Sequence, residues 1–199
     1  MSITPNDRYT QAVEYSDPNC WRSMRPVYDH FGIENLPISN KKPVLSGWLT
    51  RKYGTKAEQC VEKLAPLAQV GILMKANDLV VVDVDFDDGQ IADTIIEIFG
   101  STPIIVRTRR GFHFYYRYSL GTTARAWEGI DLKAGNAYVV SPLSDILNEK
   151  DKTVGRYQFI SEEFEWLTDN QSIALFIKLV AERALPRISC RNLDVFTAA

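Results

Sequence analysis

The segment Leu79–Phe86 constrains the fold more than any other part of the sequence. It reads Leu-Val-Val-Val-Asp-Val-Asp-Phe. Valine favours β-strands, and successive side chains of a strand point to opposite faces. The alternation predicts a strand with valines and Phe86 on one apolar face. Asp83 and Asp85 share the other face, with Cα atoms about 6.5–7 Å apart.

Two carboxylates at this spacing suggest a site for divalent cations. Asp83 and Asp85 repel each other and lose hydration within a valine-rich strand, and a bound cation relieves both penalties. Two-metal sites commonly share aspartates in this way. The alternative is that both residues only end the strand. For Asp87 and Asp88 we favour that structural role, as a turn and as a helix N-cap.

A basic hairpin follows in the sequence, with Arg109–Gly111 as its turn. The strand that leaves the turn places His113, Tyr115 and Arg117 on one face. Its alternate residues form an apolar face: Phe112, Phe114 and Tyr116. A histidine behind two arginines is suited to hold a triphosphate, and Gly111 would let that ligand approach the backbone. The alternative is a solvated hairpin at a sheet edge.

A third segment places Asp131 and Lys133 on one face of a short strand. Beside the other two motifs, this pair offers one more carboxylate and a cation near it. The alternative is an exposed ion pair, which contributes little to stability.

Composition narrows the classes of function. The net charge of −2 excludes a globally basic nucleic-acid-binding protein, although charge is segregated along the chain. Residues 78–97 carry seven acidic and no basic side chains, whereas residues 107–133 carry six basic ones. This pattern is typical either of a metal site beside a phosphate site or of simple neutralisation at the surface. Three separated cysteines and two histidines argue against a disulfide framework and a zinc site.

The remaining pattern predicts helices over 21–31, 55–64, 90–99 and 172–184, and strands over 104–108, 112–118, 137–141 and 157–160. Thr55 is the expected N-cap of the second helix, and proline and asparagine predict a loop over 35–46. No linker divides the chain, so we expect residues 1–199 to form one α+β domain. No segment is apolar enough to span a bilayer and no signal-peptide core is present, so we expect a cytoplasmic protein without a membrane partner.

The order of the three motifs, D-x-D, a histidine after a glycine turn and D-x-K, resembles the primase–polymerase (Prim-Pol) domain of the archaeo-eukaryotic primase superfamily. Lys41–Trp48 is similar to the K-x-P…G-W segment of such domains in plasmid and phage replication proteins, and Ala137–Pro142 is similar to the run after their third motif. The resemblance covers residues 35–145. Gly111 stands where a serine is frequent, and Ala137 stands where a glycine is usual.

The resemblance implies an RRM-like sheet that carries the site and packs with an N-terminal α/β module, with a C-terminal helical segment over 160–199. The implied reaction is template-directed nucleotidyl transfer with two Mg²⁺ or Mn²⁺ ions. The implied metal ligands are Asp83, Asp85 and Asp131. The implied ligands of the NTP or dNTP are His113, Arg110, Gly111 and Lys133.

The implied partners are a single-stranded DNA template and a primer in plasmid or phage replication. Their backbones would contact six basic residues: Arg107, Arg109, Arg117, Arg125, Lys41 and Lys42. The sequence contains no Walker A motif, so a helicase domain or subunit is expected elsewhere. A phage-encoded chain would act in the host cytoplasm.

Other classes of protein use parts of this pattern. A metal-dependent glycosyltransferase also holds a nucleotide diphosphate with D-x-D, but it does not account for His113 or for the pair Asp131 and Lys133. A non-catalytic RRM-like module binds nucleic acid by aromatic stacking on its sheet, whereas this sheet face carries carboxylates. A D-x-D phosphatase would need threonine or valine where Asp87 stands.

Overall fold

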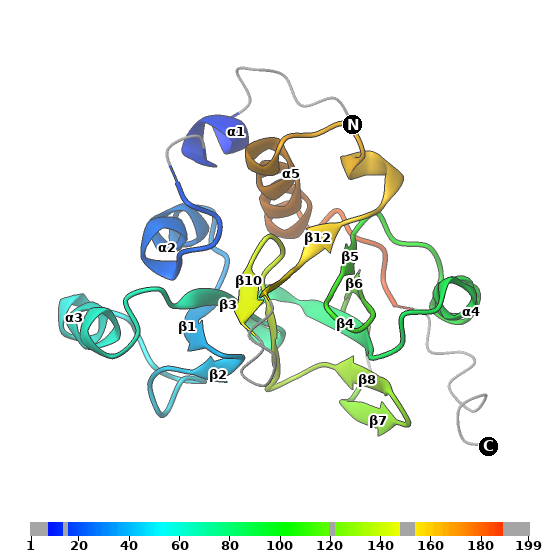
Figure 1. Cartoon of the computed structure of the whole chain (residues 1–199), viewed down its shortest axis with the longest axis horizontal. Helices are drawn as coiled ribbons and strands as arrows, with labels where there is room; N and C mark the ends of the chain where they lie inside the picture. The colour runs from blue at the N-terminus through cyan, green and yellow to red at the C-terminus, as the bar shows by residue number, and fades with distance from the viewer. Residues whose placement is uncertain (1–7, 14–15, 120–121, 148–153, 189–199) are drawn as a thin grey trace.

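The computed structural model describes residues 8–13, 16–119, 122–147 and 154–188. The end of the expected C-terminal helical segment, 189–199, lies outside the described residues. Figure 1 shows the strands gathered in the centre of the molecule. On one side lie α1 (Arg8–Val13), α2 (Trp21–His30) and α5 (Asp169–Ala181), and on the other lies α4 (Gly89–Phe99). The α+β fold class is confirmed.

The larger sheet has six strands, and all its neighbouring strands are antiparallel. Its order is β12 (Gln158–Phe159), β5 (Ile105–Arg107), β6 (Phe112–Arg117), β4 (Leu79–Val84), β8 (Ile130–Lys133) and β7 (Arg125–Trp127). The expected valine-rich strand is therefore β4, with β6 and β8 as its two neighbours. It ends two residues earlier than expected, where the Asp85 N–H donates to the Gly129 carbonyl at 2.8 Å.

Helix α4 covers one face of this sheet. Val80, Val82 and Val84 pack there with Ile95 and Phe99 of the helix. Asp88 is the N-cap, as expected, because its carboxylate accepts from the Gln90 N–H at 2.9 Å. The prediction that Phe86 belongs to this apolar face is wrong: its side chain is 39% exposed, because the strand has already ended.

A second antiparallel sheet has the order β2 (Lys42–Pro43), β1 (Asn35–Ser39), β3 (Gln69–Leu73) and β9 (Tyr138–Val140). The expectation of a loop over 35–46 is wrong for its first part, which forms the β1–β2 hairpin. Leu36 and Ile38 are fully buried, and this burial outweighs the local preference of Pro37 and Asn40 for a turn. A separate pair, β10 (Asp145–Leu147) and β11 (Val154–Arg156), was not expected from the sequence.

Most helices lie where the sequence predicts them. Helix α3 (Thr55–Leu64) matches the expected range, but its N-cap is Gly54 and not Thr55. Helix α2 continues through Pro26. Helix α5 begins before the expected range, because Thr168 and Gln171 form a capping box. No helix of the described residues is long and apolar enough to cross a membrane.

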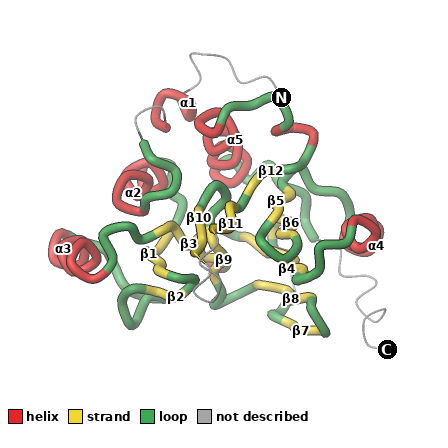
Figure 2. The backbone as a smooth tube through the Cα atoms, viewed as in Figure 1, coloured by secondary structure: helices red, strands yellow, loops and turns green. Residues whose placement is uncertain are grey.

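The two sheets meet over the other face of β4. Leu79 and Val81 pack into a cluster with Tyr115 of β6 and Val140 of β9. Strand alternation puts Asp83 on this same face, at the end of β4 where the apolar packing stops. Figure 2 shows the strands of both sheets meeting in the middle, with the helices around them. The fold therefore places Asp83 at the junction of the two sheets.

Candidate active site

The sheet register brings three of the predicted side chains into one row. Asp83 of β4 lies directly opposite His113 of β6 on one side and Asp131 of β8 on the other. Directly opposed residues in antiparallel strands have Cβ atoms about 4.5–5.5 Å apart. Asp83, His113 and Asp131 thus form one continuous polar strip, although they span 48 positions of the sequence.

Asp83 is held from two sides. His113 Nε2 lies 3.2 Å from Asp83 Oδ1, and Lys133 Nζ lies 3.7 Å from Asp83 Oδ2. Burial by itself would raise the pKa of Asp83. The hydrogen bond from His113 and the positive charges of Lys133 and Lys41 outweigh burial, so the pKa of Asp83 is lowered. Asp83 is therefore held as a carboxylate.

The other two predicted carboxylates also have basic partners. Lys133 donates to Asp131 Oδ2, so its ammonium lies between Asp83 and Asp131. Asp85 follows the end of β4, and Arg110 Nη2 binds Asp85 Oδ2 at 2.9 Å. The structure therefore places Asp83 and Asp131 together on the sheet, with Asp85 on the turn beyond it.

His113 is buried, with 4% of its surface exposed. Its ring packs edge-on against Tyr157 at a centroid distance of 5.4 Å. With Nε2 on Asp83, the Nδ1 atom has no hydrogen-bond partner among the described residues. Buried polar atoms rarely stay unpaired, so this nitrogen retains the capacity for one further hydrogen bond.

A pocket of about 340 Å³ opens in front of this row. The six-stranded sheet contributes Asp83, His113 and Lys133 to its lining, and the second sheet contributes Tyr138 of β9. Sequence reasoning assigned no site role to several further lining residues, namely Trp48, Asn136, Tyr138 and Tyr157. Trp48 could have been identified because it belongs to the K-x-P…G-W segment. No local sequence pattern indicates a site role for Tyr157.

Residues 26–174 match the family model of Prim-Pol, described as bifunctional DNA primase/polymerase, N-terminal. The match spans more than half of the chain and contains every predicted site residue. The chain belongs to the Prim-Pol family. No curated protein matches the chain. Prim-Pol membership supports a DNA primase and polymerase function.

Two basic residues of this Prim-Pol domain, Arg117 and the exposed Arg107, pair with carboxylates. Arg117, which we expected to contact DNA, binds Asp78 at 3.0 Å and the Arg183 carbonyl at 3.1 Å. Arg107 binds Asp87 at 2.6 Å and lies over the Phe112 ring, on the α4 face. These contacts do not support the expectation that Arg117 binds nucleic acid.

Gly111 has a different role from the one expected. A Cβ atom at this position would lie 1.9 Å from the Val84 carbonyl oxygen, so the glycine lets the hairpin pack against the end of β4. Its N–H donates to Thr108 Oγ1 at 3.1 Å, and its carbonyl accepts from the Thr108 N–H at 2.8 Å. Both backbone groups are therefore engaged within the hairpin, and Gly111 is not positioned as a ligand of the nucleotide.

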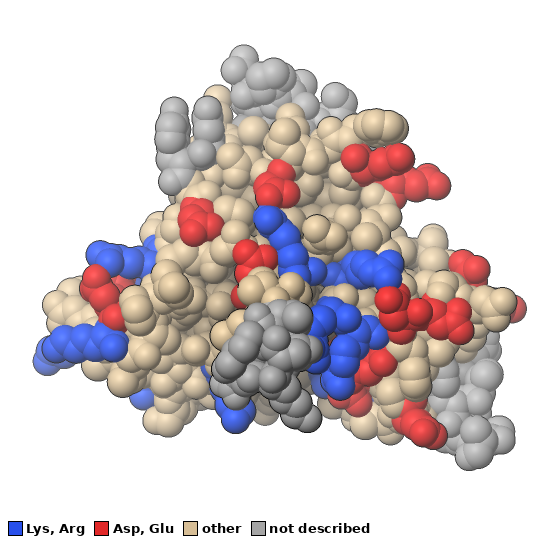
Figure 3. Space-filling model, viewed as in Figure 1, with Lys and Arg blue, Asp and Glu red and all other residues tan. Residues whose placement is uncertain are grey.

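The remaining predicted DNA contacts differ in position. Arg125 lies on the edge strand β7 and Lys42 on β2, and both are exposed. Arg109 is next to Arg110 in the hairpin turn. Figure 3 shows Lys and Arg side chains gathered over β4, β5 and β6, with acidic side chains beside them toward α4.

The donor set fits the metals that the Prim-Pol family implies. Asp83, Asp85 and Asp131 offer carboxylate oxygens, which suit Mg²⁺ and Mn²⁺. In this arrangement Lys133 and Arg110 hold those oxygens. Among the described residues, no group of three His, Cys, Asp or Glu side chains is placed to hold an ion directly. Metal binding would therefore require these basic side chains to change partners.

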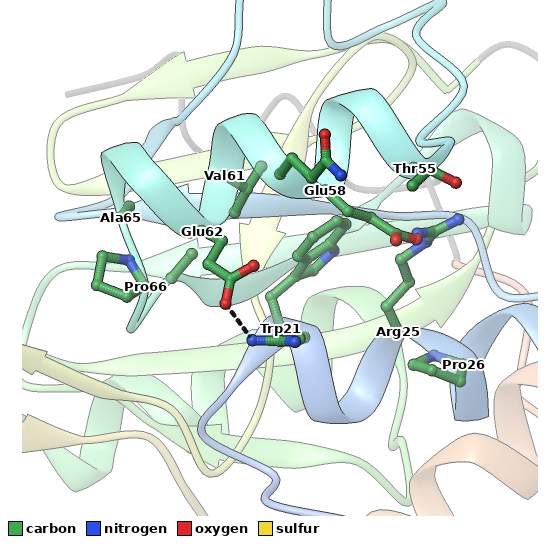
Figure 4. Close-up of a pocket in the computed structure, with 12 residues that line it drawn as sticks. Trp21, Arg25, Pro26, Thr55, Glu58, Val61, Glu62, Ala65 and Pro66 are labelled. Carbon is green, nitrogen blue, oxygen red and sulfur yellow. Dashed lines mark hydrogen bonds and ion pairs between the residues drawn. The ribbon is translucent and has the colours of Figure 1, made fainter.

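A larger cavity elsewhere does not share these properties. The groove between α2 and α3 has a volume of about 390 Å³ and contains no predicted site residue (Figure 4). Its charged side chains already pair across it: Arg22 binds Glu62 at 2.5 Å, and Arg25 binds Glu58. Size alone therefore does not identify the active site.

Proposed function

We propose that this Prim-Pol domain catalyses template-directed nucleotidyl transfer with two divalent metal ions, in the replication of plasmid or phage DNA. The observation that carries the proposal is the row formed by His113, Asp83 and Asp131, with Lys133 across the two carboxylates. It combines hard metal donors with phosphate-binding groups, and Asp83, His113 and Lys133 of this group line the pocket. The membership in the Prim-Pol family supports the same reaction.

The residues divide into two sets by their chemistry. Asp83, Asp85 and Asp131 would hold the ions. When bound, Mg²⁺ or Mn²⁺ would increase the acidity of the attacking hydroxyl and stabilise the pyrophosphate leaving group. His113, Lys133 and Arg110 are donors to the triphosphate oxygens, because charge-assisted hydrogen bonds to phosphate are short and strong.

The ion pairs of this arrangement suggest how the site responds to its ligands. Lys133 and Arg110 together pair with three carboxylates and so reduce the repulsion among them. An arriving metal–nucleotide complex offers cations to the carboxylates and phosphates to the basic groups. We therefore propose that Lys133 and Arg110 transfer from the aspartates to the triphosphate as the substrate binds.

The template and primer would bind to a surface outside the nucleotide pocket. We propose that four basic residues contact their phosphates: Arg107, Arg109, Arg125 and Lys42. Such contacts are sequence-independent and weaken as salt displaces them.

Primer extension on single-stranded DNA tests the function. The wild-type protein is assayed with dNTPs and with NTPs, with and without a primer, in Mg²⁺ and in Mn²⁺. We expect metal-dependent incorporation that Asp83→Ala abolishes while the variant remains folded by circular dichroism. Asp93→Ala, an exposed change on α4, serves as the matched control. Full incorporation by Asp83→Ala at saturating metal would refute the metal assignment.

A further inference from the structure

The β1–β2 hairpin presents Lys41 in an unusual backbone conformation. Ser39 pairs with Lys42, which leaves Asn40 and Lys41 as a two-residue turn. Their φ angles are 52° and 63°, and both positive values are typical of a type I′ turn. Glycine is favoured at the second position, because any Cβ is crowded there. A lysine in this conformation costs stability, and such strain is often kept where the side chain has a function.

Aromatic contacts fix this turn beside the pocket. The Tyr138 hydroxyl donates to the Lys41 carbonyl at 2.9 Å, and Trp48 packs edge-on against Tyr138. The Lys41 ammonium lies 5.9 Å from the centre of the Tyr157 ring. Lys41 therefore lines the same pocket as Asp83, although it comes from the other sheet.

Lys41 differs from the other basic residues near the pocket in its pairing. Lys133 and Arg110 each bind a carboxylate. Within the described part of the chain, no carboxylate lies at ion-pair distance from the Lys41 ammonium. Although Lys41 is an exposed residue, partial desolvation beside the pocket lowers the pKa of its ammonium, opposed by the charge of Asp83. An anionic ligand in the pocket would stabilise this ammonium.

We infer that Lys41 binds the triphosphate of the incoming nucleotide, so that the second sheet supplies a phosphate ligand to the active site. This assignment rests on the proposed function and replaces the DNA contact that the sequence suggested for Lys41. Its position beside His113 and Lys133 favours the nucleotide over the DNA backbone. The volume of about 340 Å³ is that of a small-molecule site and not of an extended strand.

Equilibrium titration of four proteins with dATP in Mg²⁺ tests the inference: the wild type, Lys41→Gly, Lys41→Arg and Lys56→Ala. Lys41→Gly removes the ammonium and suits the turn, so it should melt at the same or a higher temperature. We expect it to bind dATP about 10–100-fold more weakly, the effect of one charge-assisted contact. Lys41→Arg should retain most of the affinity. Lys56→Ala, a lost charge on the exposed face of α3, should match the wild type.

A parallel titration with a single-stranded oligonucleotide separates the alternatives. We expect the Lys41→Gly protein to bind the oligonucleotide as the wild type does. An unchanged dATP affinity in a folded Lys41→Gly protein would overturn the inference and leave the proposed function intact. A loss confined to the oligonucleotide would restore the DNA contact. A wild-type protein that does not bind dATP would refute the proposed function, and the inference with it.

Discussion

His113 has one ring nitrogen on Asp83 and the other without a partner among the described residues. Its burial means that the ring is not a solvated surface group. If the proposed function holds, nucleotide binding should therefore be sensitive to the imidazole itself.

Replacement of His113 by alanine should weaken nucleotide binding far more than DNA binding. The loss of one charge-assisted phosphate contact is worth about 1.5–3 kcal/mol, or ~10–100-fold in the dissociation constant. Titration with dATP and with a single-stranded oligonucleotide measures both. His113→Gln, which keeps a polar group of similar size, checks that loss of packing against Tyr157 is not the cause. Unchanged dATP affinity in both variants would return His113 to a purely structural role.

Removal of Lys133 should change metal and nucleotide binding in opposite directions. Lys133→Ala exposes the carboxylates of Asp83 and Asp131, so Mn²⁺ should bind several-fold more tightly in the absence of nucleotide. The same variant should bind dATP more weakly, because a positive charge is lost from the phosphate site. Asp131→Asn should instead weaken Mn²⁺ binding. If the pair were only a surface contact worth about 0–1 kcal/mol, both variants would resemble the wild type.

At the scale of elements, the site depends on how closely the β5–β6 hairpin packs against β4. Gly111 is the point of closest approach, with the Val84 carbonyl where a Cβ would be. Helix α2 is joined in a similarly specific way to Ser141, the residue after strand β9, by the buried Tyr28 hydroxyl and Ser141 Oγ at 2.9 Å. Each contact gives a prediction.

Gly111→Ala should separate the hairpin from the end of β4. Overpacking of this kind costs about 1–3 kcal/mol of unfolding free energy, and backbone atoms have little freedom to yield. Urea denaturation measures the loss, and primer extension should fall with it because His113 moves with the hairpin. Gly89→Ala is the control, since nothing lies within 4 Å of a Cβ there. Equal stability of the two variants would contradict the packing role.

Tyr28 should make the fold sensitive to alkaline pH. Burial raises the pKa of Tyr28, with the hydrogen bond to Ser141 opposing it. The stability from the neutral phenol is therefore fully present below the ordinary tyrosine pKa of about 10 and is lost as pH rises above it. Tyr28→Phe should lower stability at pH 7 by about 1 kcal/mol and reduce the further loss at pH 10.5. Thermal unfolding at both pH values, with Tyr118→Phe as the control, checks this.

At the scale of the whole molecule, the sequence predicts the local elements better than their assembly. Strand β4 and helix α4 follow from valine alternation and from Asp88 as a cap, which are local signals. The β1–β2 hairpin was missed because Pro37 and Asn40 dominate its local pattern, while the burial that favours it comes from distant residues.

The candidate site shows the same limit. Strand alternation indicates which face Asp83 shares, but only the pairing of β4 with β6 and β8 determines that His113 and Asp131 are its neighbours. The place of Lys41 depends on a second sheet and on contacts with Tyr138 and Tyr157. The glycine at position 111 indicates that another group lies close to the backbone there. The structure shows that this group is the Val84 carbonyl and not a ligand.

Because β4 pairs with a strand on each side, an error in its register would change the core and the site together. A slip of β4 by one residue would turn Asp83 into the apolar layer beneath α4 and bring valines to the pocket. Such a molecule would lose its core together with its chemistry, so partially active folded forms should not accumulate. The fraction of a preparation that binds dATP stoichiometrically should therefore equal the fraction that unfolds cooperatively. A folded population that fails to bind would show that the register and the site are separable.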